Sequence, residues 1–216
     1  MDDGVLLHGW LINIETDRQR PLLIYFGGNA EEVSGFLLEA RILKKWAVAA
    51  INYRGYGLSG GKPGESVLFA DALTLYDRLS KEPAIDPSRI VVMGRSLGSG
   101  VAVHLAAKRT LKGVVLISPY DAIREVAQEI YPYAPVAFLL KHPFDSYIRA
   151  PHITTPLLAL TASDDDIIPE KHSLRLIAAW GGDHRHRTLR RVDHNTIVHH
   201  PDYWREIMKF LDQTIN

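Results

Sequence analysis

A serine flanked by two glycines, in GRSLG at residues 94–98, follows the apolar run IVVMG and precedes a stretch with a helical pattern. A G-x-S-x-G sequence in this setting is typical of a tight turn between a strand and a helix, where glycine omits the Cβ atoms that would collide. Such a turn presents the Ser96 hydroxyl at the carboxyl end of a sheet. It also points the Leu97 N–H toward a developing oxyanion. We therefore predict that Ser96 is a nucleophile with Leu97 as an oxyanion donor.

A serine hydroxyl is a weak nucleophile that needs a general base, and the base needs an acid to hold it. Three adjacent aspartates follow the apolar run LLALTA, but they cannot all face one imidazole. We predict Asp165 as the acid, because a turn into a helix near Pro169 aims the residue four positions earlier inward. Asp166 and then Asp164 are the alternatives, and an aspartate that only caps the helix is the competing structural interpretation.

Ten histidines compete for the role of base. His194, in VDHN, follows a strand-like run at 188–192 and precedes the helical pattern of 201–212, so a loop can carry its imidazole over the carboxyl edge of a sheet. His199 and His200 are the rivals, although they fit the lead-in to the last helix. We predict His194 as the base and no metal site at the rival pair, which lacks acidic or thiolate partners at ligand spacing. The other histidines, at positions 8, 104, 142, 152, 172, 184 and 186, fit surfaces, ends of elements or the wrong end of the strand.

The elements that must position these residues alternate along the chain. Short β-branched or apolar runs alternate with longer helical patterns, which predicts βαβ units and an α/β fold with a mostly parallel central sheet covered by helices on both faces. The expected strands are 5–14, 21–26, 46–52, 90–94, 113–117, 157–162 and 188–192, and the expected helices are 31–45, 66–80, 97–108, one that starts near residue 169, and 201–212.

The stretch at about 119–156 interrupts this alternation with six prolines and six aromatic residues. We predict one domain over residues 1–216, in which this stretch forms a small cap-like segment over one end of the sheet. Aromatic and apolar side chains in the cap favour an uncharged acyl group. The candidate pocket residues are Gly28, Tyr120, Tyr131 and Phe138.

Composition excludes several other classes of function. The 216 residues contain no cysteine, which excludes disulfides, thiolate metal sites and a cysteine nucleophile. Lys+Arg and Asp+Glu are both 25, so no net charge attracts nucleic acid, and we expect no such partner. The N-terminus does not look like a signal peptide and no apolar run is long enough for a membrane span, so we expect a soluble, cytoplasmic chain. The sequence leaves its oligomeric state open.

Taken together, the motifs resemble those of serine hydrolases with the α/β-hydrolase fold, in the compact Bem46-like and ABHD-like branch. The resemblance covers nearly the whole chain, from about Gly4 to Leu211. It assigns the nucleophile to Ser96, the acid to Asp165 and the base to His194. The motifs that carry it are DGVLLHGW, YFGGNAEE, NYRGYGLSGGKPGE, GRSLGSG, SPYDAIREVAQEIYPYAPVAFLLKHPFDS, DDDIIP, DHN and YWREIMKFL.

The resemblance also implies the second oxyanion donor. Relatives carry His-Gly-Asn-Ala after the early strand, where this chain has Gly-Gly-Asn-Ala at 27–30. The backbone N–H of Asn29 would then join that of Leu97. Gly27 departs from the usual histidine, and a flexible turn that only ends the strand is the structural alternative.

The expected reaction is acyl transfer through an acyl-enzyme, with hydrolysis of short-to-medium acyl esters and no metal or organic cofactor. Thioesterase, amidase and peptidase activities share this machinery, and related proteins include lipid hydrolases and depalmitoylases. A non-catalytic binding protein of the same fold is the rival of another class. Arg54 and Tyr56 in RGYG are interpreted as packing residues, and the basic run at 184–191 as a solvated edge strand.

Overall fold

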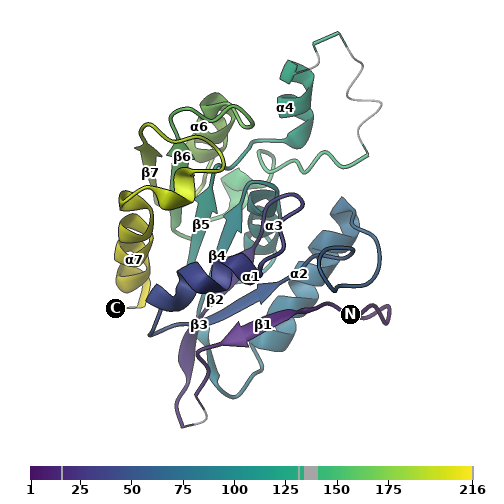
Figure 1. Cartoon of the computed structure of the whole chain (residues 1–216), viewed down its shortest axis with the longest axis vertical. Coiled ribbons are helices and arrows are strands. Elements are labelled where there is room, and N and C mark those ends of the chain that lie inside the picture. Colours follow the sequence, from purple (N-terminus) through teal and green to yellow (C-terminus); the bar gives the residue numbers. More distant parts are fainter. Residues whose placement is uncertain (16, 131, 134–140, 216) are drawn as a thin grey trace.

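A seven-stranded sheet forms the centre of the computed structural model, which describes residues 1–15, 17–130, 132–133 and 141–215 (Figure 1). The strand order is β1-β3-β2-β4-β5-β6-β7. β1 pairs antiparallel with β3, and every other pair is parallel, so the predicted mostly parallel sheet is confirmed. The strands are β1 (Gly9–Ile12), β2 (Arg20–Phe26), β3 (Ala47–Ile51), β4 (Ile85–Arg95), β5 (Gly113–Ile117), β6 (Leu157–Ala162) and β7 (His184–Leu189).

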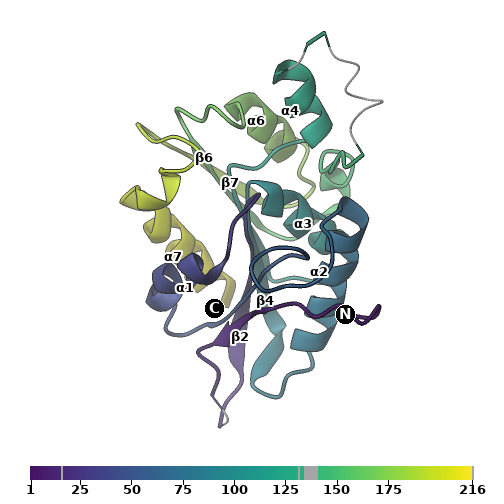
Figure 2. The ribbon, with the colours of Figure 1, turned by 45° about the vertical axis from the view of Figure 1, so that its right-hand side comes forward.

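Helices cover both faces of the sheet. Figure 2 shows α1 and α7 on one side of the strands and α2 and α3 on the other. In the described ranges, no helix is both long and apolar enough to cross a lipid bilayer. The α-helices are α1 (Ser34–Glu39), α2 (Glu65–Leu79), α3 (Leu97–Ala106), α4 (Ile123–Ile130), α6 (Glu170–Ala178) and α7 (Asp202–Ile215), and the short 3-10 helices are η1 (Ala40–Ile42), η2 (Ala150–His152) and η3 (Ile197–His199).

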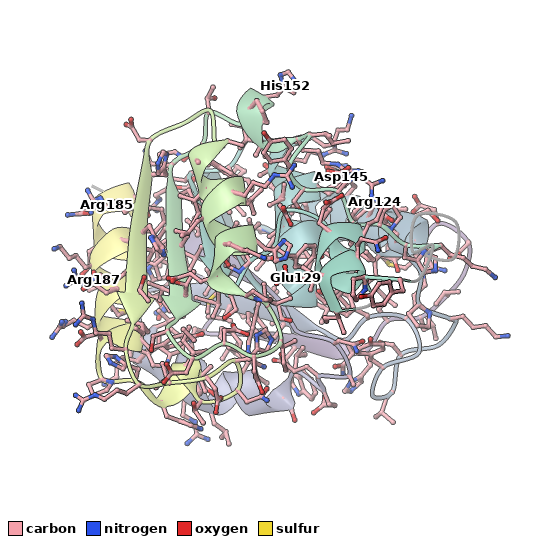
Figure 3. The ribbon with its side chains drawn as sticks, turned by 90° about the horizontal axis from the view of Figure 1, so that it is seen from above. Arg124, Glu129, Asp145, His152, Arg185 and Arg187 are labelled. Carbon is pink, nitrogen blue, oxygen red and sulfur yellow. The ribbon has the colours of Figure 1, made fainter. Side chains whose placement is uncertain are left out.

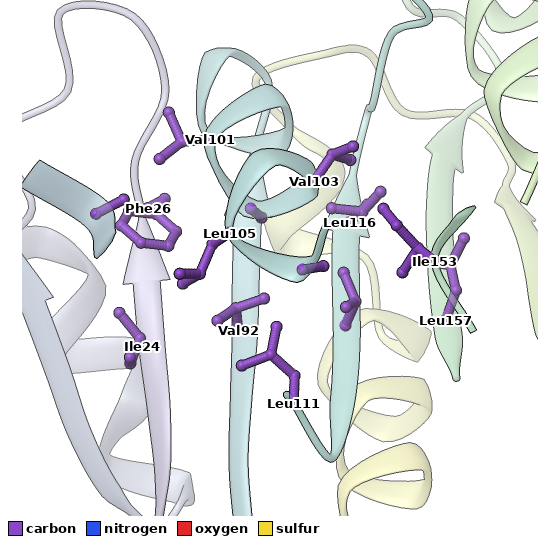
Figure 4. Close-up of a cluster of buried hydrophobic side chains, with 14 of the residues drawn as sticks. Ile24, Phe26, Val92, Val101, Val103, Leu105, Leu111, Leu116, Ile153 and Leu157 are labelled. Carbon is purple, nitrogen blue, oxygen red and sulfur yellow. The ribbon is translucent and has the colours of Figure 1, made fainter. Parts of the chain in front are cut away.

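Successive side chains of the central strand β4 point to opposite faces of the sheet, so this strand contributes to two hydrophobic cores. Val92 in β4 packs with the α3 residues Val101 and Leu105 (Figure 4), whereas its neighbours Val91 and Met93 belong to the core on the α7 side. Strands buried on both faces read as continuous apolar runs, which is the pattern of parallel sheets. The core therefore fixes β4, whose carboxyl end leads directly to Ser96.

Several elements differ from the sequence-based bounds: the strand expected over 5–14 covers Gly9–Ile12, and the strand expected over 90–94 covers Ile85–Arg95. Two further differences have local physical reasons. The helix expected over 31–45 is shorter, because the Val33 N–H is bound by the Asn52 side chain at 3.0 Å and the chain before α1 is held as a loop. The last strand begins at His184, not at residue 188. It lies at the edge of the sheet and carries exposed Arg185 and Arg187 (Figure 3), so no hydrophobic alternation marks it.

The segment between β5 and β6 is fastened to α6 through a buried aspartate. Asp121 is 0% exposed, and its carbonyl oxygen accepts the N–H groups of Ser146 at 2.8 Å and Tyr147 at 2.9 Å. Its carboxylate lies 2.8 Å from His172 Nδ1 and accepts a bond of 3.1 Å from Arg175 Nη1. Asp121 thus joins this segment to α6. The hypothesis of one domain with a cap-like segment stays a prediction.

The contact between α3 and β2 leads to a stability prediction. A Cβ on Gly98 would lie 2.1 Å from the carbonyl oxygen of Phe26, and backbone atoms cannot move away as a flexible side chain can. We expect Gly98→Ala to lower the free energy of unfolding by about 1–3 kcal/mol, as overpacking does. Urea denaturation measures this change.

Gly35→Ala is the matched control, because its Cβ would meet nothing within 4 Å and it lies in α1. This substitution should raise the free energy of unfolding by about 0.5–1 kcal/mol. Equal denaturation midpoints for the two variants would contradict the packing argument.

Candidate active site

Ser96 sits in a strained turn between β4 and α3. Its backbone has φ 50° and ψ −117°, a left-handed conformation that non-glycine residues avoid. A Cβ on Gly94 would lie 2.3 Å from Gly98 O, so both glycines are required by close packing. The Ser96 N–H continues the β4–β5 ladder by donating to Ile117 O at 2.9 Å. The tight turn expected from GRSLG is therefore present.

His194 lies between Ser96 and Asp165. Its Nε2 atom is 2.9 Å from Ser96 Oγ, and its Nδ1 atom is 2.9 Å from Asp165 Oδ2. The side chains of His194 and Asp165 are 5% and 3% exposed, which shields this chain of contacts from water. The structure thus brings together the three residues that the sequence singled out, from the loops after β4, β6 and β7.

The local turn selects Asp165 among the three aspartates. Its Oδ1 atom accepts the backbone N–H groups of Ile167 at 3.1 Å and Ile168 at 2.8 Å, which aims the carboxylate inward. Asp164 and Asp166 are exposed. Burial raises the pKa of Asp165, but the hydrogen bonds from His194 and the Ile168 N–H outweigh it and leave the pKa below its ordinary value. The carboxylate therefore stays ionised and can hold an imidazolium.

The loop after β2 lies against Ser96. A Cβ on Gly28 would be 3.7 Å from the Ser96 Cβ atom, so the buried Gly28 adjoins Ser96. Its role in a substrate pocket stays a prediction. The Asn29 side chain is fixed because Tyr56 Oη donates to its Oδ1 atom at 2.8 Å. Leu97 is the first residue of α3, and N–H groups in the first turn of a helix have no partner within the helix. Their assignment as oxyanion donors remains a prediction.

The structure describes only one of the three aromatic residues predicted for the pocket. Tyr120 is 1% exposed and its hydroxyl donates to the Leu97 carbonyl at 3.1 Å, so it supports the turn and does not line an open pocket. Its hydroxyl occupies the space next to Gly100, where a Cβ would lie 2.2 Å away. Tyr131 and Phe138 lie outside the described residues.

Two charged residues beside the site were missed by the sequence reasoning. Arg95 and Glu31 form an ion pair of 3.1 Å although 64 positions separate them. The signals for them were present in the sequence, since Arg95 is the variable residue before the serine in GRSLG and Glu31 ends the loop GGNAE. Nothing in either segment alone indicates that they meet.

The other candidate residues lie elsewhere or are used for packing. Arg54 is 7% exposed and makes a bidentate pair with Asp71 at 2.5 and 2.6 Å, which agrees with the packing interpretation. His200 Nδ1 accepts the Asp202 N–H at 3.1 Å at the start of α7, as a lead-in to that helix does. The edge strand β7 keeps its basic side chains on the surface (Figure 3).

Comparison with known proteins places the chain among hydrolases. Residues 18–146 match the hydrolase family described as serine aminopeptidase, S33. An uncharacterized Mycobacterium tuberculosis protein is 35% identical over 195 residues, which cover 89% of this chain and 69% of the relative. The α/β hydrolase domain-containing protein WAV2 of Arabidopsis thaliana is 30% identical over 82% of this chain and 63% of its own length. Protein bem46 of Schizosaccharomyces pombe is 28% identical over 97% and 73%.

Solved structures share the same fold. An acetyl xylan esterase from Paenibacillus sp. R4 has a TM-score of 0.80 at 21% identity, over 98% of this chain and 80% of that one. Est1E from Butyrivibrio proteoclasticus, solved with ferulic acid bound, has a TM-score of 0.80 at 16% identity, over 99% and 95%. These likenesses confirm the α/β-hydrolase fold that the motifs predicted.

The lowered pKa of Asp165 predicts how stability depends on pH. A depressed carboxyl pKa stabilises the folded state above the unfolded value of about 3.9, and this contribution is lost as the pH falls through the folded pKa. Asp165→Asn keeps an acceptor for the two N–H groups and removes the charge that faces His194. We expect it to lower the free energy of unfolding by about 1 kcal/mol between about pH 5 and 8, with the difference shrinking below about pH 4.

Urea denaturation of both proteins across this pH range measures the difference. Asp166→Asn is the control, because this neighbouring carboxylate is exposed and its replacement should change stability by less than about 0.5 kcal/mol at every pH. The argument is refuted if the difference in free energy of unfolding between wild type and Asp165→Asn grows as the pH falls, because the predicted pH dependence has the opposite sign.

Proposed function

Since this chain belongs to the serine aminopeptidase S33 family of α/β hydrolases, in its Bem46-like branch, we propose that it cleaves carboxylic esters of short-to-medium acyl chain through Ser96, His194 and Asp165. The single observation that supports this most is the chain of contacts at 2.9 Å from Asp165 Oδ2 through the buried imidazole to Ser96 Oγ. A hydroxyl next to an oriented imidazole can lose its proton as it attacks a carbonyl carbon.

In the first step, Ser96 Oγ attacks the ester carbonyl and His194 Nε2 takes the hydroxyl proton. Asp165 stays ionised and stabilises the imidazolium, in keeping with its lowered pKa. The N–H groups of Leu97 and Asn29 stabilise the oxygen that becomes negative. His194 then gives its proton to the leaving alcohol, and an acyl-enzyme on Ser96 remains.

In the second step, His194 takes a proton from a water molecule as that water attacks the acyl-enzyme. The tetrahedral intermediate uses the same two N–H groups, and its collapse returns the proton to Ser96 and releases the acid. One buried imidazole therefore serves as base and acid in both halves of the reaction. None of these proton transfers needs a metal ion or an organic cofactor.

Charge around Ser96 favours an ester over a peptide with a free N-terminus. An aminopeptidase must bind an α-ammonium group, which calls for an available carboxylate beside the nucleophile. Here the carboxylates of Glu31 and Asp165 are already paired, with Arg95 and His194 respectively. An ammonium group would have to compete with those partners, whereas an uncharged ester would not.

The short acyl length rests on the segment between β5 and β6. Its helix α4 has eight residues, and the Asp121 carbonyl oxygen accepts the N–H groups of Ser146 and Tyr147 where the segment returns. We expect a cover this short to favour a short acyl chain. One of the similar folds is named an acetyl xylan esterase, so a two-carbon acyl group is the first substrate to test.

A panel of p-nitrophenyl esters tests the proposal. We expect the wild type to be fastest on acyl chains of about two to four carbons, because a shallow pocket gains little from longer ones. Ser96→Ala should lower kcat by about 10³-fold or more, since the nucleophile is lost. Steady-state hydrolysis gives both results, with Ser88→Ala at the other end of β4 as the control that keeps wild-type rates.

Wild-type rates no higher than those of Ser96→Ala on every ester would refute the esterase proposal. Faster cleavage of thioesters or amides with the same dependence on Ser96 would replace the substrate class and keep the catalytic residues.

A fluorophosphonate probe, which forms a covalent bond to an activated serine, tests the nucleophile separately. We expect labelling of the wild type and of Ser88→Ala, and none of Ser96→Ala. His194→Ala should slow labelling by about 10³-fold, because the hydroxyl then has no base. Gel fluorescence measures the rates. Labelling that persists in Ser96→Ala would assign the nucleophile to another residue.

A further inference from the structure

The Glu31 carboxylate holds the loop that carries the proposed oxyanion donor. Its Oε2 atom accepts the Gly28 N–H at 2.6 Å, and its Oε1 atom accepts the Tyr25 hydroxyl at 2.7 Å. Burial raises the pKa of Tyr25 well above its ordinary value, with a further contribution from the Glu31 charge, so this hydroxyl keeps its proton and donates. Asn29 lies between Gly28 and Glu31, the two residues that the first of these hydrogen bonds joins.

Arg95 connects that loop with the histidine loop. Its Nη1 atom is 3.1 Å from Glu31 Oε2, and its Nη2 atom donates to the His194 carbonyl at 3.3 Å and to Asn195 Oδ1 at 3.4 Å. It is the last residue of β4 and immediately precedes Ser96. One guanidinium therefore contacts the loops after β2 and β7 from the strand that carries the nucleophile.

The location of this pair has an electrostatic consequence. A Cβ on Gly28 would lie 3.2 Å from Glu31 Oε2, 3.7 Å from Ser96 Cβ and 3.8 Å from Arg95 Nη1, so a carboxylate and a guanidinium flank the backbone beside the nucleophile. The side chains of Glu31 and Arg95 are only 18% and 17% exposed, and like charges repel more strongly where water is partly excluded. An unpaired carboxylate here would oppose a developing oxyanion.

We propose that Glu31 and Arg95 are a positioning pair: Glu31 fixes the Gly28–Asn29 backbone for the oxyanion, and Arg95 both neutralises that carboxylate and holds the His194 loop. This inference rests on the proposed function, since it concerns the same site. Neither side chain takes part in bond making, and both act through the backbone groups and the imidazole that they hold. Because Arg95 neutralises it, the Glu31 carboxylate can hold this backbone beside a site that becomes negatively charged during the reaction.

A double-mutant cycle tests this proposal. Arg95→Met leaves the Glu31 charge unpaired, so we expect kcat for a short ester to fall about 100-fold with KM within about threefold of wild type. Glu31→Gln keeps an acceptor for the Gly28 N–H and should cost about tenfold in kcat. The double variant should be about tenfold faster than Arg95→Met, because the unpaired charge is gone.

A purely structural role predicts a different pattern, in which the double variant is the slowest and has the lowest Tm. Arg89→Met is the matched control, because Arg89 pairs with Asp86 at 2.6 Å on the same strand far from Ser96. It should keep wild-type kcat. The proposal is overturned if Arg95→Met stays within threefold of wild type, or if Glu31→Gln does not restore part of its loss.

Hydrogen–deuterium exchange separates this proposal from the proposed function. We expect the amides of residues 27–31 and 190–196 to exchange at least about tenfold faster in Arg95→Met than in wild type, and unchanged in Arg89→Met. Unchanged exchange in both segments overturns the pair even if the protein proves to be an active esterase. Absence of wild-type hydrolysis and labelling refutes the proposed function, while faster exchange would still support the positioning role.

Discussion

The approach of the first turn of α3 to the end of β2 is the contact on which the other features of the site depend. Gly98 lies so close to the Phe26 carbonyl that a Cβ would be 2.1 Å from it, and Gly94 is packed as tightly against Gly98. These contacts leave no space for relaxation, so the backbone at Ser96 remains at a positive φ that costs about 1–3 kcal/mol. They also set the separation between the nucleophile and the loop after β2. The geometry of the site therefore depends on positions 94 and 98, where glycine has no Cβ atom.

The sheet places the other residues of the site relative to this turn. Ladder hydrogen bonds fix the ends of β4, β6 and β7 relative to one another, and each loop then needs only to turn a side chain inward. Two backbone N–H groups of its own loop orient the Asp165 carboxylate, and Arg95 donates a hydrogen bond to the His194 carbonyl. Groups from distant parts of the chain thus meet because backbone hydrogen bonds and one arginine side chain hold the loops that carry them. The arrangement suits a reaction in which charge appears and disappears on fixed atoms.

The sequence was informative where the determinants are local. The turn at Ser96 follows from the spacing of two glycines, and the choice of Asp165 among three aspartates follows from one turn before Pro169. The α/β class followed from the alternation of patterns along the chain. These features depend on residues that are neighbours in the sequence, so the order and spacing of residue types are enough to predict them.

The features that were missed depend on pairs far apart in the chain. The hydroxyl of the buried Tyr120 donates to a carbonyl 23 positions earlier, and Arg95 pairs with Glu31 across 64 positions. The solvated edge strand expected from the basic run at 184–191 is present, but its start was placed at residue 188. Backbone pairing with β6, rather than a hydrophobic face, makes His184–Leu189 a strand. Residue type alone does not encode such partners, and only the folded arrangement reveals them.

The buried Asp121 also bears on how such a protein can diversify. It fastens Ser146 and Tyr147 on one flank of the cap-like segment, while His172 connects Asp121 with Glu129 near the end of α4 on the other flank. Both flanks are anchored to α6, the helix that follows the Asp165 loop. A change in the length of chain between the two anchors would therefore leave α6 and the loop that carries Asp165 in place. Asp121 thus separates the segment between the anchors from the loop that positions Asp165.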